Sequence, residues 1–187
     1  PALAAARATW LEEPFYPHAY RAHAELAAHS QGVGIAGGEG AHTVHMATNL
    51  IEFGQVSFVQ IDTGRIGGIS AAKSVADVAA QRGVTYVNHT FTTHLALSAS
   101  LQPYAGLADH RICEYPVEAS TLAHAVTRTP LALDANGEIS APDAPGLGIE
   151  VALDLLAPYL RTLDISVDGI TLYASHNPAG RAVKIDA

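Results

Sequence analysis

The sequence repeats one unit, in which a short apolar run ends on an ionisable side chain and a helix-like segment follows. Successive units are about 25 residues apart, a length that accommodates one strand, one helix and two short loops. Parallel strands joined by helices bring their carboxyl ends to the same edge, and β/α barrels carry their catalytic groups there. We therefore predict an α/β fold that gathers five ionisable residues at one edge: Glu12, Glu39, Asp62, His89 and Glu114.

The stretch from residue 58 to residue 90 shows this unit most clearly. Its first apolar run ends on Asp62, a glycine-rich turn at residues 65–68 leads into a helix-like segment, and a second apolar run ends at His89. Because both strands would end at the same edge, Asp62 and His89 can meet as a dyad in which the carboxylate orients the imidazole ring.

Local patterns predict the elements around these residues. The apolar runs predict strands at residues 9–11, 33–36, 58–61, 84–87 and 111–113. Amphipathic spacing predicts helices over residues 18–30, 43–53, 70–82 and 93–101. Three of these helices run up to a glycine, at Gly32, Gly54 and Gly83, as expected where a helix stops.

The pattern changes after Pro116. Residues 131–140 predict a hairpin that turns at Asn136-Gly137, and residues 152–163 predict a helix interrupted by Pro158. Residues 165–173 predict a second hairpin, turning at Asp168-Gly169. We expect these hairpins to pack outside the barrel, because antiparallel pairs do not fit its repeat.

Composition and charge limit the possible partners. The chain has 187 residues, enough for a substantial core, and its net charge of −8 with scattered basic residues argues against a nucleic-acid partner. No apolar run is long enough to cross a bilayer, so no membrane partner is expected. The only cysteine, Cys113, falls in a predicted buried strand, which suits a reducing, cytoplasmic location. The first residue is Pro1 and residues 1–8 resemble the end of a helix, so we expect the sequence to be part of a longer protein.

Two further patterns have ordinary explanations. Residues 32–37 spell G-x-G-x-x-G, but a helix precedes them, whereas the dinucleotide-binding fingerprint follows a strand. Gly37-Gly38 more simply allows a tight turn beside Glu39. His42 and His45 are three residues apart, but a solvated helix start explains them better than a metal site does.

Several motifs together point to a family. They are Trp-Leu-Glu-Glu-Pro at residues 10–14, Gly38-Glu39, Asp62 followed by Arg-Ile-Gly-Gly, Asn88-His89, Glu-Tyr-Pro at 114–116 and Pro-Gly-Leu-Gly at 145–148. In order and spacing they resemble the mandelate racemase subgroup of the enolase superfamily, the group that also includes muconate lactonizing enzyme-like proteins. The resemblance covers residues 1–163 and implies the C-terminal part of a modified (β/α) TIM-type barrel.

The resemblance implies a role for each residue. Glu12 and Glu39 correspond to the second and third ligands of Mg²⁺, and Glu13 belongs to the same motif without binding metal. His89 corresponds to the catalytic base and Asp62 to its dyad partner. Glu114 corresponds to the acid that hydrogen-bonds the substrate carboxylate as it becomes an enediolate.

The resemblance also implies an activity and a missing part. The family's capping domain, its first metal ligand and its Lys-x-Lys motif have no counterpart here; the only lysines are Lys73 and Lys184. We expect residues 1–163 to form the barrel part and residues 164–187 a hairpin and tail that pack on the capping domain. The expected activity is Mg²⁺-dependent dehydration of an acid sugar by a homo-oligomer that needs the N-terminal part. Racemisation or epimerisation, cycloisomerisation, a non-catalytic barrel fragment and a nucleotide-binding protein are the alternatives.

Overall fold

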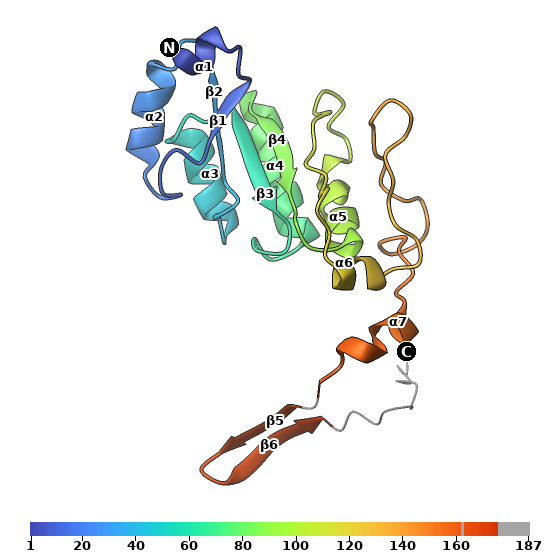
Figure 1. Ribbon diagram of the computed structural model, residues 1–187. Helices are drawn as coiled ribbons and strands as arrows, with labels where there is room; N and C mark the ends of the chain where they lie inside the picture. The colour runs from blue at the N-terminus through green and yellow to red at the C-terminus, as the bar shows by residue number, and fades with distance from the viewer. Residues whose placement is uncertain (162, 176–187) are drawn as a thin grey trace.

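The fold is built on one parallel sheet of four strands in the order β1-β2-β3-β4 (Figure 1). The structure, a computed structural model, describes residues 1–161 and 163–175. The strands follow one another in the sheet as they do in the sequence: β1 Trp10–Glu12, β2 Gly34–Gly37, β3 Phe58–Asp62 and β4 Thr85–His89. This arrangement confirms the predicted α/β succession of parallel strands, with a helix after each strand.

The helices that join the strands lie close to their predicted positions. They are α2 Tyr20–Ala28, α3 Val44–Glu52, α4 Ile69–Arg82 and α5 His94–Leu101. Shorter helices are α1 Ala2–Ala5, η1 Gln102–Tyr104, α6 Thr121–Ala125, α7 Leu153–Leu156 and η2 Ala157–Tyr159. In Figure 1, α4 lies behind β3 and β4, and α3 packs against both α4 and β3.

Local capping fixes where these helices begin and end. The side chains of Thr43 and Thr93 accept hydrogen bonds from the backbone N–H groups of the first turns of α3 and α5. Gly83 ends α4 in the left-handed conformation, with a φ of 69°. A residue without a Cβ adopts this conformation freely, and the chain then turns directly into β4.

The core lies between the sheet and the helices. Ile35, Val59, Ile61 and Tyr86 point from the strands into one buried cluster with the apolar stripes of α3 and α4. Strands β3 and β4 are buried along most of their length, as expected for parallel strands covered on both faces.

Two predicted strand regions are wrong. Residues 111–113 form no strand, because the backbone of the following Glu114 bonds to the side chain of Asn88 and not to a neighbouring strand. Residues 131–140 turn at Asn136-Gly137 as predicted but form no strand pair. Asp134 closes that turn locally, since its side chain accepts from the N–H groups of Asn136 and Glu138.

The predicted helix at 152–163 is shortened to α7 and η2, with a proline at the start of η2.

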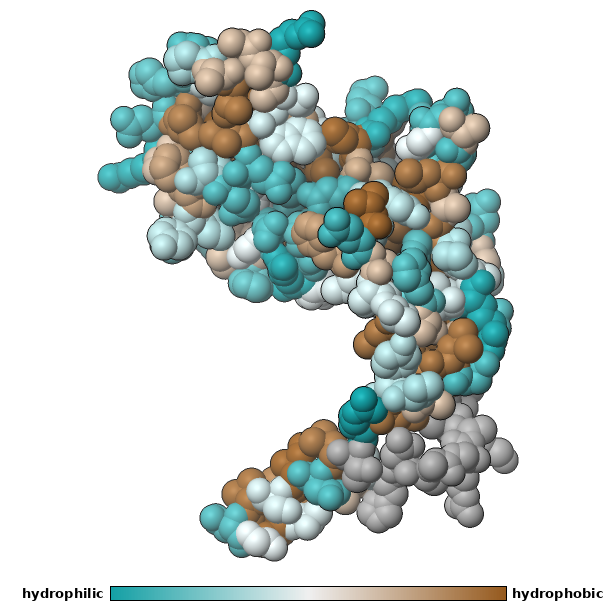
Figure 2. All heavy atoms as spheres, viewed as in Figure 1, coloured by the Kyte–Doolittle hydropathy of each residue, from teal (hydrophilic) through white to brown (hydrophobic). Residues whose placement is uncertain are grey.

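The second predicted hairpin is present. Strands β5 (Leu163–Val167) and β6 (Ile170–Ser175) pair in antiparallel fashion and project away from the sheet (Figure 1). Every residue of β5 is exposed, and Figure 2 shows hydrophobic residues along the hairpin. The tail predicted at 176–187, with Lys184, lies outside the described residues. Within the described part of the chain, no helix is both long and apolar enough to cross a membrane.

Candidate active site

His89 and Asp62 meet at the ends of adjacent strands. They are direct partners in the β3–β4 register, and Nδ1 of His89 donates a hydrogen bond to Oδ2 of Asp62 over 2.9 Å. The His89 side chain is only 2% exposed, so the ring is held firmly against the sheet. This contact assigns the proton to Nδ1 and leaves Nε2 as the nitrogen that faces the site.

Asp62 stays ionised in spite of its position. Burial works to raise its pKa, but the backbone N–H of Arg65, the hydrogen bond from His89 and the charges of both residues together lower the pKa below its usual value. The N–H of Arg65 lies 2.9 Å from Oδ1, so both carboxylate oxygens are engaged. An ionised, doubly held carboxylate keeps the imidazole in one orientation.

Glu39 lies on the other side of the His89 ring. Its Oε2 lies 3.0 Å from Nε2 of His89, a close polar contact that is not a hydrogen bond. Its Oε1 accepts from the Arg65 guanidinium over 3.0 Å, and the same nitrogen reaches the Glu39 carbonyl. Arg65 therefore links the two carboxylates that flank His89.

A tight turn presents Glu39 to the site. Gly38 has a φ of 127°, and a Cβ there would approach the Gln60 carbonyl oxygen to 2.8 Å. This confirms the turn predicted beside Glu39. The N–H of Gly38 donates to Oε1 of Glu13 over 2.8 Å. Glu13 thus supports the turn that carries Glu39.

Glu12 ends β1 and is more open to solvent. Its Oε2 accepts a hydrogen bond from Nε1 of Trp10 over 2.9 Å. It also lies near enough to Glu114 to affect its pKa. The first strand therefore contributes a carboxylate to the same edge as β2, β3 and β4.

Glu114 is held at this edge by two side-chain amides. Its Oε1 accepts from Nε2 of Gln60 over 3.1 Å, while its backbone N–H and C=O bond to Asn88 at 2.8 and 3.2 Å. Burial raises the pKa of Glu114 and the charge of Glu12 raises it further; His89, the Thr90 N–H and the Gln60 amide partly oppose this. Such a carboxyl group is suited to donating a hydrogen bond to an oxygen that gains negative charge.

The donor chemistry at this edge suits a hard divalent cation. Glu12 and Glu39 supply carboxylate oxygens, the ligands that Mg²⁺ prefers, and both side chains are accessible to solvent. Two carboxylates are an incomplete set. Over the described ranges, no three His, Cys, Asp or Glu side chains lie close enough together to hold a metal ion. The oxygen donors of Glu12 and Glu39 therefore suit such a cation in kind, but two carboxylates alone do not make up a complete site.

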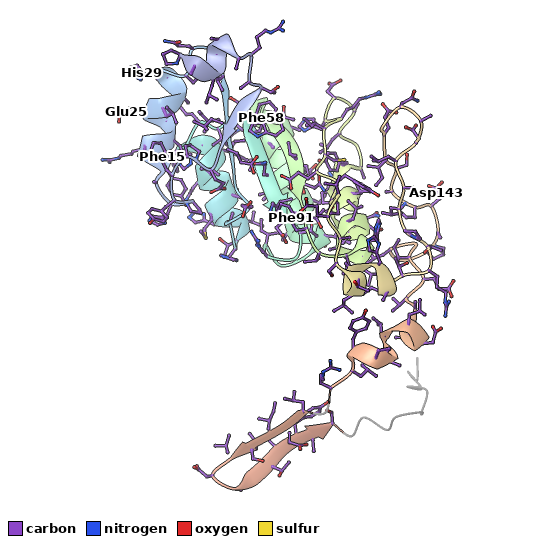
Figure 3. All side chains as sticks on the ribbon, viewed as in Figure 1. Phe15, Glu25, His29, Phe58, Phe91 and Asp143 are labelled. Carbon is purple, nitrogen blue, oxygen red and sulfur yellow. The ribbon has the colours of Figure 1, made fainter. Side chains whose placement is uncertain are left out.

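Some contributors to the site were not predicted. Arg65 and Asn88 were noticed only as parts of motifs, and Gln60 was given no role. Phe91, labelled in Figure 3, also escaped prediction; its ring meets the His89 ring edge-on at 4.8 Å between centroids. His94 is buried and accepts from the Leu131 N–H, so it packs outside this group.

Comparisons with known proteins show which proteins this chain resembles. D-galactarolactone cycloisomerase from Agrobacterium fabrum is 32% identical over 158 residues, which is 80% of this chain and 41% of that protein. L-talarate/galactarate dehydratase from Salmonella typhimurium is 37% identical over 98 residues, 51% of this chain and 24% of that protein. The crystal structure of a predicted mandelate racemase from Rhodobacter sphaeroides is 55% identical, with a TM-score of 0.88 over 93% of this chain and 44% of that one.

The chain spans less than half of the length of each of these proteins. The family model described as enolase C-terminal domain-like matches residues 1–155, most of the sequence. Together with the strand-end carboxylates and the His89–Asp62 pair, this match shows that the chain belongs to the enolase superfamily, within the mandelate racemase subgroup.

Proposed function

We propose that the full-length protein is a Mg²⁺-dependent enzyme that removes the α-proton of an acid-sugar carboxylate and then expels the β-hydroxyl group. The observation that carries this proposal is the His89 ring, fixed through Nδ1 by Asp62, with Nε2 directed toward the strand-end carboxylates. Nε2 is the only ring atom free to exchange a proton with a substrate. Names of relatives that act on acid sugars support the substrate class.

Each residue then has a defined task. Nε2 of His89 takes the α-proton, or returns one to the departing β-hydroxyl, and Asp62 keeps the ring in place. Glu114 donates a hydrogen bond to the substrate carboxylate as negative charge builds on it. Loss of H from the α-carbon and OH from the β-carbon gives a 2-keto-3-deoxy acid and water.

Glu12 and Glu39 would hold Mg²⁺ with a ligand from outside this sequence. When bound, the ion supplies positive charge next to the substrate carboxylate, which makes the α-proton more acidic. We also propose that the upstream part of the protein supplies this third ligand and that the active form is a homo-oligomer in the cytoplasm.

Cycloisomerisation is the second candidate, because a relative that shares 32% identity is named for it. It begins with the same proton removal and differs in the group that leaves. Racemisation would return the proton to the opposite face. The product therefore distinguishes these reactions while the role of His89 stays the same.

The test uses the full-length protein with Mg²⁺ and a panel of aldonates and aldarates that includes galactarate and xylonate. His89→Asn is expected to lower turnover of the best substrate by at least about 10²-fold, the low end for general acid–base catalysis. Exchange of the α-proton with solvent deuterium should fall with it. His29→Asn is the matched control, since His29 is exposed at the end of α2, far from Phe91 in Figure 3.

Near-normal turnover by His89→Asn would reject the proposed base. Exchange that survives while dehydration stops would assign proton removal to another group and leave His89 as the acid. No turnover of any panel member by the wild type would favour a barrel without this activity.

A further inference from the structure

Gln60 is an unusual residue for its position. It lies in the middle of β3, is 1% exposed and points to the same face as Asp62, two residues further along the strand. Its neighbours Val59 and Ile61 are fully buried apolar residues. The Gln60 amide reaches across the interior to Glu114, a residue 54 positions away in the sequence.

The amide gains little stability from this position. Nε2 has one partner, Glu114 Oε1 at 3.1 Å, while Oε1 of Gln60 is buried without any hydrogen-bond partner in the described structure. A buried polar atom left unpaired destabilises a fold, so an apolar residue of similar size would serve packing better. The interaction that keeps an amide useful here is the one with Glu114.

The main chain of Glu114 is fixed by a different residue. Asn88 accepts from the Glu114 N–H and donates to the Glu114 carbonyl, and is itself held by Ser100 and Tyr104. With the backbone anchored on the helix side of the sheet, rotation of the Glu114 side chain is the remaining freedom. Gln60, from the interior side, limits that rotation together with the Thr90 N–H.

We propose that Gln60 is a positioning residue for Glu114: its amide holds one carboxyl oxygen and so fixes how the other meets the substrate carboxylate. This inference rests on the role given to Glu114 in the proposed function. An amide suits this task because it carries no charge and offers both a donor and an acceptor. By turning over, it can bond to Glu114 whether the carboxyl group is ionised or protonated.

Gln60→Met in the full-length protein tests this directly, because it keeps the shape of the side chain and removes both polar atoms. With Mg²⁺ and the best substrate of the panel, kcat should fall about 10- to 100-fold, the worth of a hydrogen bond to a charged group, while KM changes less than about 3-fold. The kcat of Gln60→Glu should fall at least as far, because this change places two carboxyl groups side by side. Gln102→Met is the matched control: it removes a glutamine hydrogen bond to the Ser98 carbonyl, outside the site, and should leave kcat unchanged.

A thermal-unfolding cycle provides a readout that needs no activity. Gln60→Met should raise the midpoint more in a Glu114→Leu background, where the amide has no partner, than in the wild type, where it also removes the contact with Glu114. Equal shifts in both backgrounds would overturn the contact. An unchanged kcat, or a loss confined to KM, would overturn the positioning role. If the wild type turns over no acid sugar, the proposed function of Glu114 fails, and the cycle alone decides whether Gln60 holds that side chain.

Discussion

Glu12 and Glu13 are adjacent in the sequence but have different partners. Glu13 accepts a hydrogen bond from Gly38, whereas Glu12 contacts the Trp10 ring nitrogen and faces solvent at the strand end. The Glu12 carboxylate is therefore accessible at the strand end, whereas the Glu13 carboxylate supports a turn.

The first prediction compares these residues. Glu12→Gln and Glu39→Gln in the full-length protein should each weaken Mg²⁺ binding by at least about 10-fold, because each removes a charged oxygen ligand from a hard cation. Glu13→Gln should bind Mg²⁺ normally, since an amide oxygen can still accept from Gly38. Isothermal titration calorimetry measures all three. Wild-type affinity in both ligand variants would reject the metal assignment.

The second prediction concerns the raised pKa of Glu114. Burial raises its pKa above the ordinary 4.5, so between the two values the folded protein binds this proton more tightly than the unfolded chain does. The contribution of protonated Glu114 to the stability of the fold is therefore fully present below the ordinary pKa. It is lost as the pH rises through the raised pKa. Glu114→Gln, which cannot ionise, should be more stable than the wild type at pH 7 and similar at pH 4.

Urea unfolding at the two pH values measures this difference. Asp62 has the opposite dependence, since its pKa is lowered and its contribution is lost as the pH falls. Both proteins share Asp62, so its effect cancels when they are compared. A stability difference that is the same at pH 4 and pH 7 would contradict the raised pKa of Glu114.

At the scale of elements, Asn88 is the side chain that anchors the backbone of Glu114 to the sheet. Asn88 is fully buried and makes four hydrogen bonds with Glu114, Ser100 and Tyr104. We expect Asn88→Ala to lower the free energy of unfolding by about 2–4 kcal/mol, because it leaves buried groups unpaired. Asn49→Ala, which removes only a surface contact with His45, should change it by less than about 0.5 kcal/mol. Similar effects of the two changes in urea titrations would show that Asn88 does not anchor the segment.

The segment that carries Glu114 also shows which elements could be predicted from the sequence and which could not. Strands β1 to β4 and helices α2 to α5 were predicted because apolar runs, amphipathic spacing and stop signals are local in sequence. The strand at 111–113 was wrong because its partner is a side chain 26 residues away, for which no local signal exists.

The residues of the site were likewise predictable only where the signal is local in the sequence. The ends of the strands were predicted to carry ionisable residues, and the structure brings Asp62, His89 and Glu39 into contact. Arg65 and Gln60 act on residues 26 and 54 positions away, so only the folded chain reveals their partners.

At the scale of the whole molecule, the β5–β6 hairpin is the least covered element. Several of its large apolar side chains are more than half exposed, among them Val167, Ile170 and Leu172. A two-stranded hairpin is only marginally stable in water by itself. We predict that a surface outside this sequence covers the hairpin, as expected if residues 164–187 pack on a capping domain.

Hydrogen–deuterium exchange compares the two situations. The paired amides of β5 and β6 should exchange slowly in the full-length protein and rapidly in a protein consisting of residues 1–187 alone. Amides of β3 and β4 should be protected in both and serve as the internal reference. Equally rapid exchange of the hairpin in both proteins would contradict this prediction.

The attachment of Glu114 through Asn88 separates the site into two independently adjustable parts. Asp62 and His89 share one backbone ladder, so displacing either strand displaces both residues. The loop that carries Glu114 is attached without a ladder, and its length and composition can change while β3 and β4 keep their register. Changes to residues 108–119 that keep Glu114 and Asn88 are therefore expected to move Glu114 relative to the His89–Asp62 pair without disturbing that pair.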